Sequence, residues 1–201
     1  ENIQKYLNKD FEFFIIGGSY YDISQHEPAG FFDTKKKLKD AKVIKDLNLA
    51  IVDWVVGCSI LVNLSKFDEK KIFDENFFLF FEETDLCKRV KLKGENVFMS
   101  NDLKIDHLGF KSSLADNQKY EIEFLKLRNW HYMWSYFYYH KKNYSYSFAL
   151  KKSMSRLIRS FFKSIYYTII FDKKNKVIYS NRLMGLLSSI LNKKSSLRIK
   201  F

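Results

Sequence analysis

The stretch of sequence that decides the fold runs from Phe73 to Gly94 and reads FDENFFLFFEETDLCKRVKLKG. An aromatic and leucine run, residues 77–81, leads directly into three acids, and basic residues occupy the second half of the stretch. Acids in a first turn, bases in a last turn and a glycine just beyond are what the helix dipole and C-terminal cap geometry favour. We therefore predict a helix that begins at the acids and ends before Gly94.

Apolar runs on both sides of this helix predict the strands of a mixed sheet. Phe11–Ile16 precedes Gly17 and Gly18 and is expected to be a buried strand that stops in a turn. Leu49–Val62 is rich in Ile, Val, Trp and Leu, which is typical of strands buried on both faces. The remaining predicted pieces are a polar surface excursion (25–46), a short helical turn (65–71) and two short strands (97–99 and 103–105). The fold class expected is α/β, a partial Rossmann-like arrangement around a mixed sheet.

The last third of the chain is predicted to be helical. Residues 120–139 carry apolar side chains over a wide surface. Phe148–Phe171 has apolar residues at helical spacing, with Lys and Arg between them. We expect two helices here, the second basic and amphipathic.

Charge divides the chain into two parts. The 201 residues carry a net charge of +12, and 46% of them are hydrophobic, which excludes a disordered chain. Residues 141–201 contain 15 Lys and Arg against a single acid, Asp172, whereas residues 1–140 contain 20 basic and 22 acidic residues. This asymmetry predicts an anionic partner for the C-terminal part.

The two cysteines and the absence of a long apolar run bear on location. Cys58 and Cys87 lack the spacing of a zinc site and are expected to be buried free thiols in a reducing compartment. No apolar run of the length of a membrane span, and no signal peptide pattern, is found in the sequence. The expected location is the cytoplasm.

The acids Glu82, Glu83 and Asp85 admit two interpretations. Carboxylates at a helix start are common because they cap the helix and interact with its dipole. Alternatively, acids that follow an aromatic core element emerge at its rim, where a carboxylate can act as a general base.

Several linked motifs resemble the family 2 glycosyltransferases, which have the inverting GT-A fold, and within them the rhamnosyltransferase-like group. The motifs are DWVVGC (53–58), FDENFFLFFEETDLCKR (73–89), KG (93–94), IDHLG (105–109) and KS (111–112). The family pattern is D-W-x-x-G, then F-D-E-x-F-F-x-x-x-E-D-x-D-L-x-x-R, then a lysine- or alanine-glycine step and a histidine before a glycine-serine loop. Residues 52–113 carry the strong part of the resemblance.

The resemblance implies roles for individual residues. Glu83 stands where the family usually has a catalytic Asp, and would deprotonate the acceptor hydroxyl, with Glu82 and Asp85 orienting it. The resemblance implies that the acceptor is bound by Asp53, Trp54, Gly57 and Arg89. Arg89 is also expected to pair with one of the acids across a helical turn. His107 matches a histidine that in some members helps to bind Mg²⁺ or Mn²⁺ at the donor phosphates. Helix capping for the acids, core packing for Trp54 and structural burial for His107 remain the alternatives.

The resemblance also implies an overall function: transfer of a sugar from a nucleotide-diphosphate donor to a saccharide acceptor, lipid-linked by expectation, in cell-surface polysaccharide synthesis. Residues 1–118 would be the acceptor-binding half of the catalytic domain, and 119–201 a basic tail that associates with the inner face of the cell membrane through 148–171. The nucleotide-binding half with its Asp-x-Asp has no counterpart here, so we expect a C-terminal fragment.

Three alternatives stay open at this point. In the first alternative, the chain is a non-catalytic basic module that binds nucleic acid or a membrane surface. The Tyr and Phe residues interleaved with Lys motivate this interpretation. Against nucleic acid, the acidic residues would repel phosphate. In the second alternative, the chain is an inactive remnant of a transferase. In the third, residues 148–171 form an ordinary amphipathic helix packed on the catalytic domain.

Overall fold

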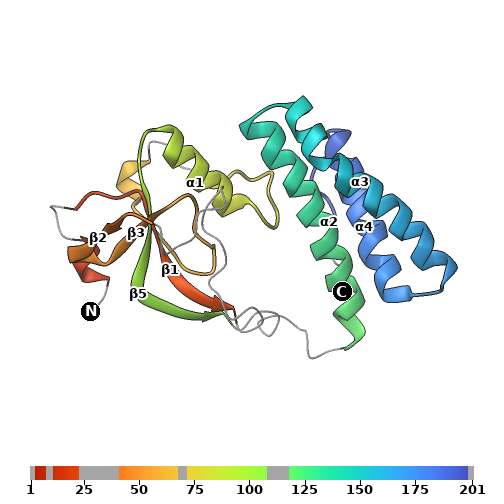
Figure 1. The fold of residues 1–201 in the computed structure, drawn as a ribbon, viewed down its shortest axis with the longest axis horizontal. Helices are drawn as coiled ribbons and strands as arrows, with labels where there is room; N and C mark the ends of the chain where they lie inside the picture. Colours follow the sequence, from red (N-terminus) through yellow and green to blue (C-terminus); the bar gives the residue numbers. More distant parts are fainter. Residues whose placement is uncertain (1–2, 8–10, 23–40, 68–71, 108–117, 199–201) are drawn as a thin grey trace. The chain divides into compact units, whose positions relative to one another are not determined.

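The computed structural model describes residues 3–7, 11–22, 41–67, 72–107 and 118–198, and its residues form two compact units (Figure 1). Residues 1–73 and 83–112 belong to an α/β unit, and residues 74–82 and 113–201 belong to a helical unit. The chain therefore passes from one unit to the other between Glu82 and Glu83. The functional division predicted at residue 118 stays a prediction.

The α/β unit is built on a five-stranded sheet of order β2-β3-β5-β1-β4. The central strands β1 and β5 are parallel, and the pairs β1–β4, β3–β5 and β2–β3 are antiparallel. The strands are β1 (Ile15–Asp22), β2 (Val43–Ile44), β3 (Leu49–Val52), β4 (Ile60–Val62) and β5 (Val97–His107). The predicted α/β class with a mixed sheet is confirmed.

Alternation along the strands gives this sheet two buried faces. Ile15, Val97 and Met99 lie on the face covered by helix α1 (Glu82–Leu92), and the intervening residues face the other side. That second face packs against Tyr6 of the short 3-10 helix η1 (Gln4–Leu7), whose hydroxyl meets Ser100 Oγ at 2.7 Å. Figure 1 shows α1 lying across the sheet. The helix predicted before Gly94 is confirmed, and Gly94 has the left-handed φ of 84° expected of a C-terminal cap.

The glycine pair predicted to end the first strand lies inside it instead. Strand β1 begins at Ile15 and runs through Gly17 and Gly18 to Asp22. A Cβ on Gly17 would lie 2.4 Å from Cβ of Val55, and one on Gly18 would lie 2.8 Å from Oγ of Ser59. These glycines therefore serve close packing within a strand and not a turn.

Other predicted elements change in extent. The two short strands at 97–99 and 103–105 form one strand, β5, and the gap between them is the bulge where Gly18 pairs with Ser100 and Ser19 with Lys104. The helical turn predicted at 65–71 is the 3-10 helix η4 (Leu64–Lys66). The excursion predicted at 25–46 lies largely outside the described residues, and its end forms β2 and part of the 3-10 helix η3 (Lys45–Leu47).

The helical unit contains three long helices. The two predicted helices are confirmed as α2 (Gln118–Asn143) and α3 (Tyr146–Ile169), and a third, α4 (Lys173–Ile190), was not predicted. Helix α4 packs against α2 so closely that a Cβ on Gly185 would lie 2.1 Å from the carbonyl oxygen of Trp130. None of the helices in the described residues is both long enough and apolar enough to cross a membrane.

The aromatic run 77–81 is irregular chain packed on α2, not the regular core element that was expected. Rings of Phe77 and Tyr138 lie 5.0 Å apart and those of Phe81 and Tyr139 lie 5.3 Å apart, centroid to centroid. Ser135 Oγ donates a hydrogen bond of 2.7 Å to the carbonyl oxygen of Leu79. This packing fixes the chain immediately before the acids.

Candidate functional site

Glu83 lies in the first turn of α1, directly after a strained piece of backbone. Phe80 and Phe81 have φ values of 66° and 70°, in the left-handed region that bulky residues avoid. Each such residue costs on the order of 1–3 kcal/mol and persists only where its surroundings hold it. Here the ring packing on α2 holds it. Strain of this kind concentrates at functional sites.

The motif DWVVG has no regular secondary structure, and its residues lie along one face of α1. Lys91 Nζ donates to Asp53 Oδ1, Val55 makes a backbone hydrogen bond to the thiol of Cys87, and Gly57 lies so near Glu83 that a Cβ built on it would be 3.8 Å from that side chain. Positions 83, 87 and 91 are one helical turn apart, so they span about 12 Å of helix. Residues 53–57 in extended conformation span about 13 Å. Two residues of the segment therefore match each turn of the helix, which brings Gly57 to Glu83.

Gly57 leaves one side of the Glu83 side chain uncrowded. A Cβ built on Gly57 would lie 3.8 Å from Cβ, Cγ and Cδ of Glu83, which is ordinary van der Waals contact. Gly57 is itself exposed, and Glu83 is half-buried. The Glu83 carboxylate is held on the protein side, with its Oε2 atom buried, and the exposed Gly57 lies next to it.

The neighbouring thiols respond to the Glu83 carboxylate. Burial first, and then the Glu83 charge, raise the pKa of Cys87 to about 12, against the opposing hydrogen bond from Val55. Partial desolvation and the same charge raise the pKa of Cys58. Cys87 is buried as predicted, but the prediction for Cys58 is wrong: its side chain is exposed, because it follows Gly57 in the surface turn between β3 and β4. Both cysteines are therefore protonated thiols near neutral pH and not nucleophiles.

Asp85 and Arg89 form a structural ion pair one turn apart. Arg89 Nε donates to Asp85 Oδ2 at 3.1 Å, and the same guanidinium donates to the carbonyl oxygen of Ile72. Asp85 is fully buried. The pairing of Arg89 with one of the acids is as expected, and it stabilises the start of α1 and the chain at Ile72. An orienting role for Asp85 and an acceptor-binding role for Arg89 stay predictions.

The remaining motif residues are placed as follows. Asp53 is held by Lys91, and Trp54 is half-buried against the core beneath α1. Glu82 belongs to the helical unit, and within the described residues its buried Oε2 atom has no hydrogen-bond partner. A buried carboxylate oxygen without a partner is costly, and such a group is a common feature of binding sites.

The metal prediction rests on a side chain that the structure does not describe. His107 is the last residue of β5, where its backbone is in register with Asp22 of β1, and its side chain lies outside the described part, as do Gly109 and Ser112. Among the residues that are described, no three His, Cys, Asp or Glu side chains are grouped so that they could hold a metal ion. The Mg²⁺ or Mn²⁺ site therefore stays a prediction.

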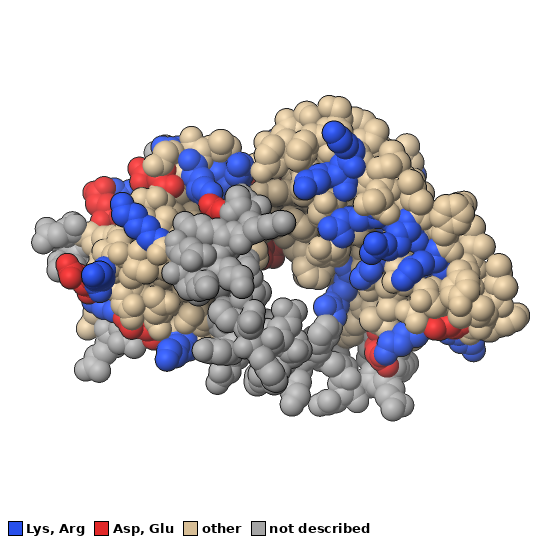
Figure 2. All heavy atoms as spheres, in the orientation of Figure 1, with Lys and Arg blue, Asp and Glu red and all other residues tan. Residues whose placement is uncertain are grey.

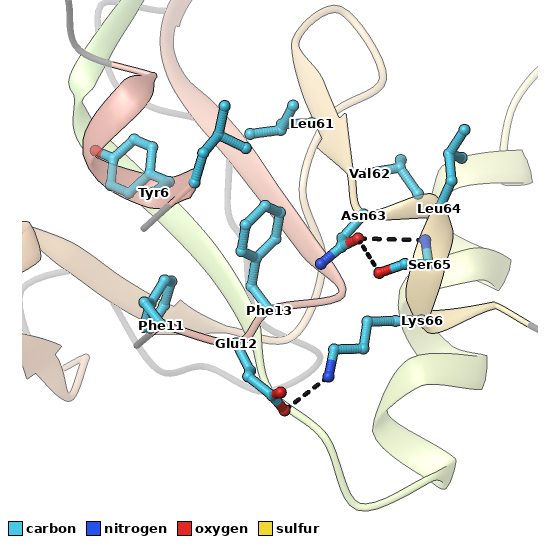
Figure 3. A pocket seen from close by; sticks show the side chains of 11 residues that line it. Tyr6, Phe11, Glu12, Phe13, Leu61, Val62, Asn63, Leu64, Ser65 and Lys66 are labelled. Atoms are coloured by element: carbon cyan, nitrogen blue, oxygen red, sulfur yellow. Dashed lines mark hydrogen bonds and ion pairs between the residues drawn. The ribbon is translucent and has the colours of Figure 1, made fainter. Parts of the chain in front are cut away.

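A cavity on the other side of the sheet is a separate feature (Figure 3). It has a volume of about 360 Å³ and is lined by Tyr6, Leu7, Phe11, Glu12, Phe13 and residues 61–66. Lys66 pairs with Glu12 at 2.7 Å, and Asn63 Oδ1 accepts from the backbone N–H and the hydroxyl of Ser65. Its polar side chains thus bond to one another, and four of its lining residues belong to the core opposite α1. We do not assign chemistry to it.

Sequence reasoning missed the partners that build the Glu83 site. Val55 and Lys91 position the segment, and neither was singled out; Cys58, which was expected only as a buried thiol, lies beside Glu83. A signal for them exists: Asp53, Val55 and Gly57, at every second position of the segment, face positions 91, 87 and 83, at every fourth position of the helix. It becomes readable only when the two segments are known to be neighbours.

Comparison with known proteins finds a short similarity. The chain is 35% identical over 60 residues to rhamnosyltransferase WbbL of Escherichia coli (strain K12). The matched stretch covers 30% of this chain and 22% of that protein. No family model matches the chain, and no solved structure matches it. The similarity suggests a relationship to glycosyltransferases.

Proposed function

Taking that relationship as the premise, we propose that this chain carries the acceptor-activating part of an inverting, family 2-like glycosyltransferase. The observation that supports this most directly is the position of Glu83. Its carboxylate lies at the start of α1, after a strained turn, beside the exposed Gly57. We propose that an acceptor alcohol reaches this partly buried carboxylate from the side of Gly57.

The proposed step is a single displacement. Glu83 accepts the proton of an acceptor hydroxyl while that oxygen forms a bond to the anomeric carbon of the donor sugar. The bond from this carbon to the nucleoside diphosphate breaks on the opposite side, so the configuration is inverted and the diphosphate leaves with the electron pair. Proton removal contributes about 10²–10⁴-fold to such a rate. Positioning supplies much of the rest.

The neighbouring groups support the base by holding it in place. The Asp53–Lys91 and Asp85–Arg89 ion pairs fix the loop and the helix on two sides of Glu83. We propose that Gly57 and Trp54 line the path of the acceptor, and that Glu82 orients the acceptor hydroxyl. The acceptor class we propose is a saccharide, and the donor a nucleotide sugar. His107 is the proposed ligand for Mg²⁺ or Mn²⁺, and no step above depends on it.

The test is a substitution of Glu83 in the full-length product of the gene that encodes this chain. Glu83→Gln keeps the size and polarity of the side chain but removes the base, so transfer from a panel of nucleotide sugars should fall about 10²–10⁴-fold. Glu83→Asp moves the carboxylate back by one methylene and should retain part of the activity. Anomeric NMR of the product reports inversion.

Glu95→Gln is the matched control because Glu95 is an exposed glutamate just after α1. It should leave the rate unchanged. An unchanged rate in Glu83→Gln would remove Glu83 from the mechanism, and a full-length protein without transfer to any acceptor would favour an inactive remnant.

A further inference from the structure

Helix α3 has three distinct faces, and its buried face is made of small residues. Ala149, Ser153 and Ser160 are buried there, in a unit where α3 packs against α2 and α4. Small side chains let helices approach closely without using large apolar ones. The large apolar residues of α3 are therefore left for another surface.

The second face is an exposed apolar stripe, which we define as Met154, Ile158, Phe161, Ile165 and Ile169. These residues follow at intervals of four, three, four and four, so they form one line along the helix. Their exposed fractions range from 41% to 67%. The stripe continues into Ile170 and Phe171 at the turn before α4, where Phe171 is 88% exposed. A continuous exposed apolar surface of this kind marks a binding site.

The third face is a basic row: Lys152, Arg156, Arg159 and Lys163. Its intervals of four, three and four repeat those of the stripe two residues earlier, and because two residues turn an α-helix by about 200°, the basic row lies on the side of the helix opposite the stripe. Helix α3 contains no acid. Arg156 lies over the Tyr136 ring, and Lys163 donates to the Tyr179 hydroxyl at 3.1 Å, so both of these cations are supported by the unit. Figure 2 shows Lys and Arg gathered on the helical unit, with few acids in view.

We propose that α3 and the turn after it lie in the surface of an anionic phospholipid membrane, with the stripe among the acyl chains and the basic row at the headgroups. An apolar face opposite a basic face is the arrangement that an in-plane interfacial helix requires. Each cation near an anionic surface strengthens binding. The helix lies in the interface and does not cross the bilayer, consistent with its composition.

Two other binding partners, a nucleic acid and a second copy of this chain, each match only one of the two exposed faces of α3. A nucleic acid neutralises the basic row but leaves the apolar stripe in water. A second copy of this chain covers the stripe but leaves the basic row without negative charge, because α3 contains no acid. Only an anionic lipid surface supplies both an apolar phase for the stripe and negative charge for the basic row.

The experiment is sedimentation of the purified chain with vesicles of phosphatidylcholine alone and with vesicles in which about a third is phosphatidylglycerol. We expect salt-sensitive binding to the anionic vesicles. The pair Lys152→Gln with Arg159→Gln should lower the partition coefficient about 25-fold. The pair Phe161→Ser with Ile165→Ser should lower it by more than about tenfold. A Phe162→Trp variant should show a blue shift of its emission, since this exposed position borders the stripe.

The matched control is Leu64→Ser with Leu92→Ser, two exposed apolar residues of the α/β unit, and it should bind as the unchanged chain does. All exchanged residues are exposed, so circular dichroism should show the same helix content. Absence of binding to anionic vesicles overturns the proposal, as does a shift from dimer to monomer in the stripe variants without vesicle binding. Oligonucleotide binding that depends on the basic row alone overturns it as well. No sugar donor is present, so the outcome is independent of the proposed transfer.

Discussion

Helices α1 and α3 carry the same kind of amphipathic pattern and use it in opposite ways. In α1 the apolar residues Leu86 and Val90 are buried against the sheet. In α3 the apolar stripe is exposed, and serines are buried instead. The pattern that predicts a helix therefore does not predict which of its faces the protein covers. Which face is buried depends on the element against which the helix packs. Large apolar side chains of α1 pack on the sheet, whereas α3 packs closely against other helices through small side chains.

The largest expected effect tests this contrast directly. Leu86→Ala removes a fully buried side chain beneath α1 and should reduce the free energy of unfolding by about 2–5 kcal/mol. Ile158→Ala, in the stripe of α3, removes a half-exposed side chain and should change it by no more than about 0.5 kcal/mol. Urea denaturation followed by circular dichroism measures both.

Val90→Ala serves as a second buried position in α1, where a smaller loss in the same direction is expected. If Ile158→Ala lowers the free energy of unfolding as much as Leu86→Ala does, then the stripe is covered in the folded protein. The contrast between the two helices would then be wrong.

The sequence allowed the helix at 82–92 and the class of the sheet to be predicted because their signals are local. Acids, bases and Gly94 define α1 within one stretch, and apolar runs define strands. Helix α4 was missed because Gly185 and several serines weaken its apolar pattern, and those small residues are present for a contact with Trp130 that lies far away in the sequence. The role of Gly17 was misjudged for the same reason, since Val55 is its neighbour only in the folded chain.

The candidate site around Glu83 was also predictable only where its signals are local. The local pattern singled out Glu83 and the linked motifs singled out Gly57, and in the structure the two residues are neighbours. The strain at Phe80 and Phe81 had no local signal, because aromatic residues with positive φ are stabilised by rings of α2 that follow some fifty residues later. Whether His107 joins the site depends on a segment outside the described residues.

Two glycines of the α/β unit sharpen the comparison at the level of single contacts. Gly17→Ala would press a methyl group onto the buried Val55 at 2.4 Å, so a loss of about 1–3 kcal/mol in stability is expected. Gly57→Ala meets Glu83 only at 3.8 Å and should leave stability within about 0.5 kcal/mol. Thermal unfolding of both variants checks this. A large loss in Gly57→Ala would show that the space beside Glu83 is already filled, which would contradict an open approach to the base.

The smallest effect concerns the ion pair that holds the segment before the acids on α2. Partial burial opposes ionisation of Asp74, but hydrogen bonds from Lys142 at 2.8 Å, from Asn76 and from Tyr138 outweigh it and lower the pKa to about 2. Because the unfolded pKa is higher, this contribution is present above about pH 4 and is lost as the pH falls towards 2. Asp74→Asn keeps an oxygen for Asn76 but removes the charge, and with solvent screening it should cost about 1 kcal/mol at neutral pH. Urea midpoints of the two proteins should converge as the pH falls from 4 to 2, and a difference that stays constant would show that Lys142 does not stabilise the charged carboxylate.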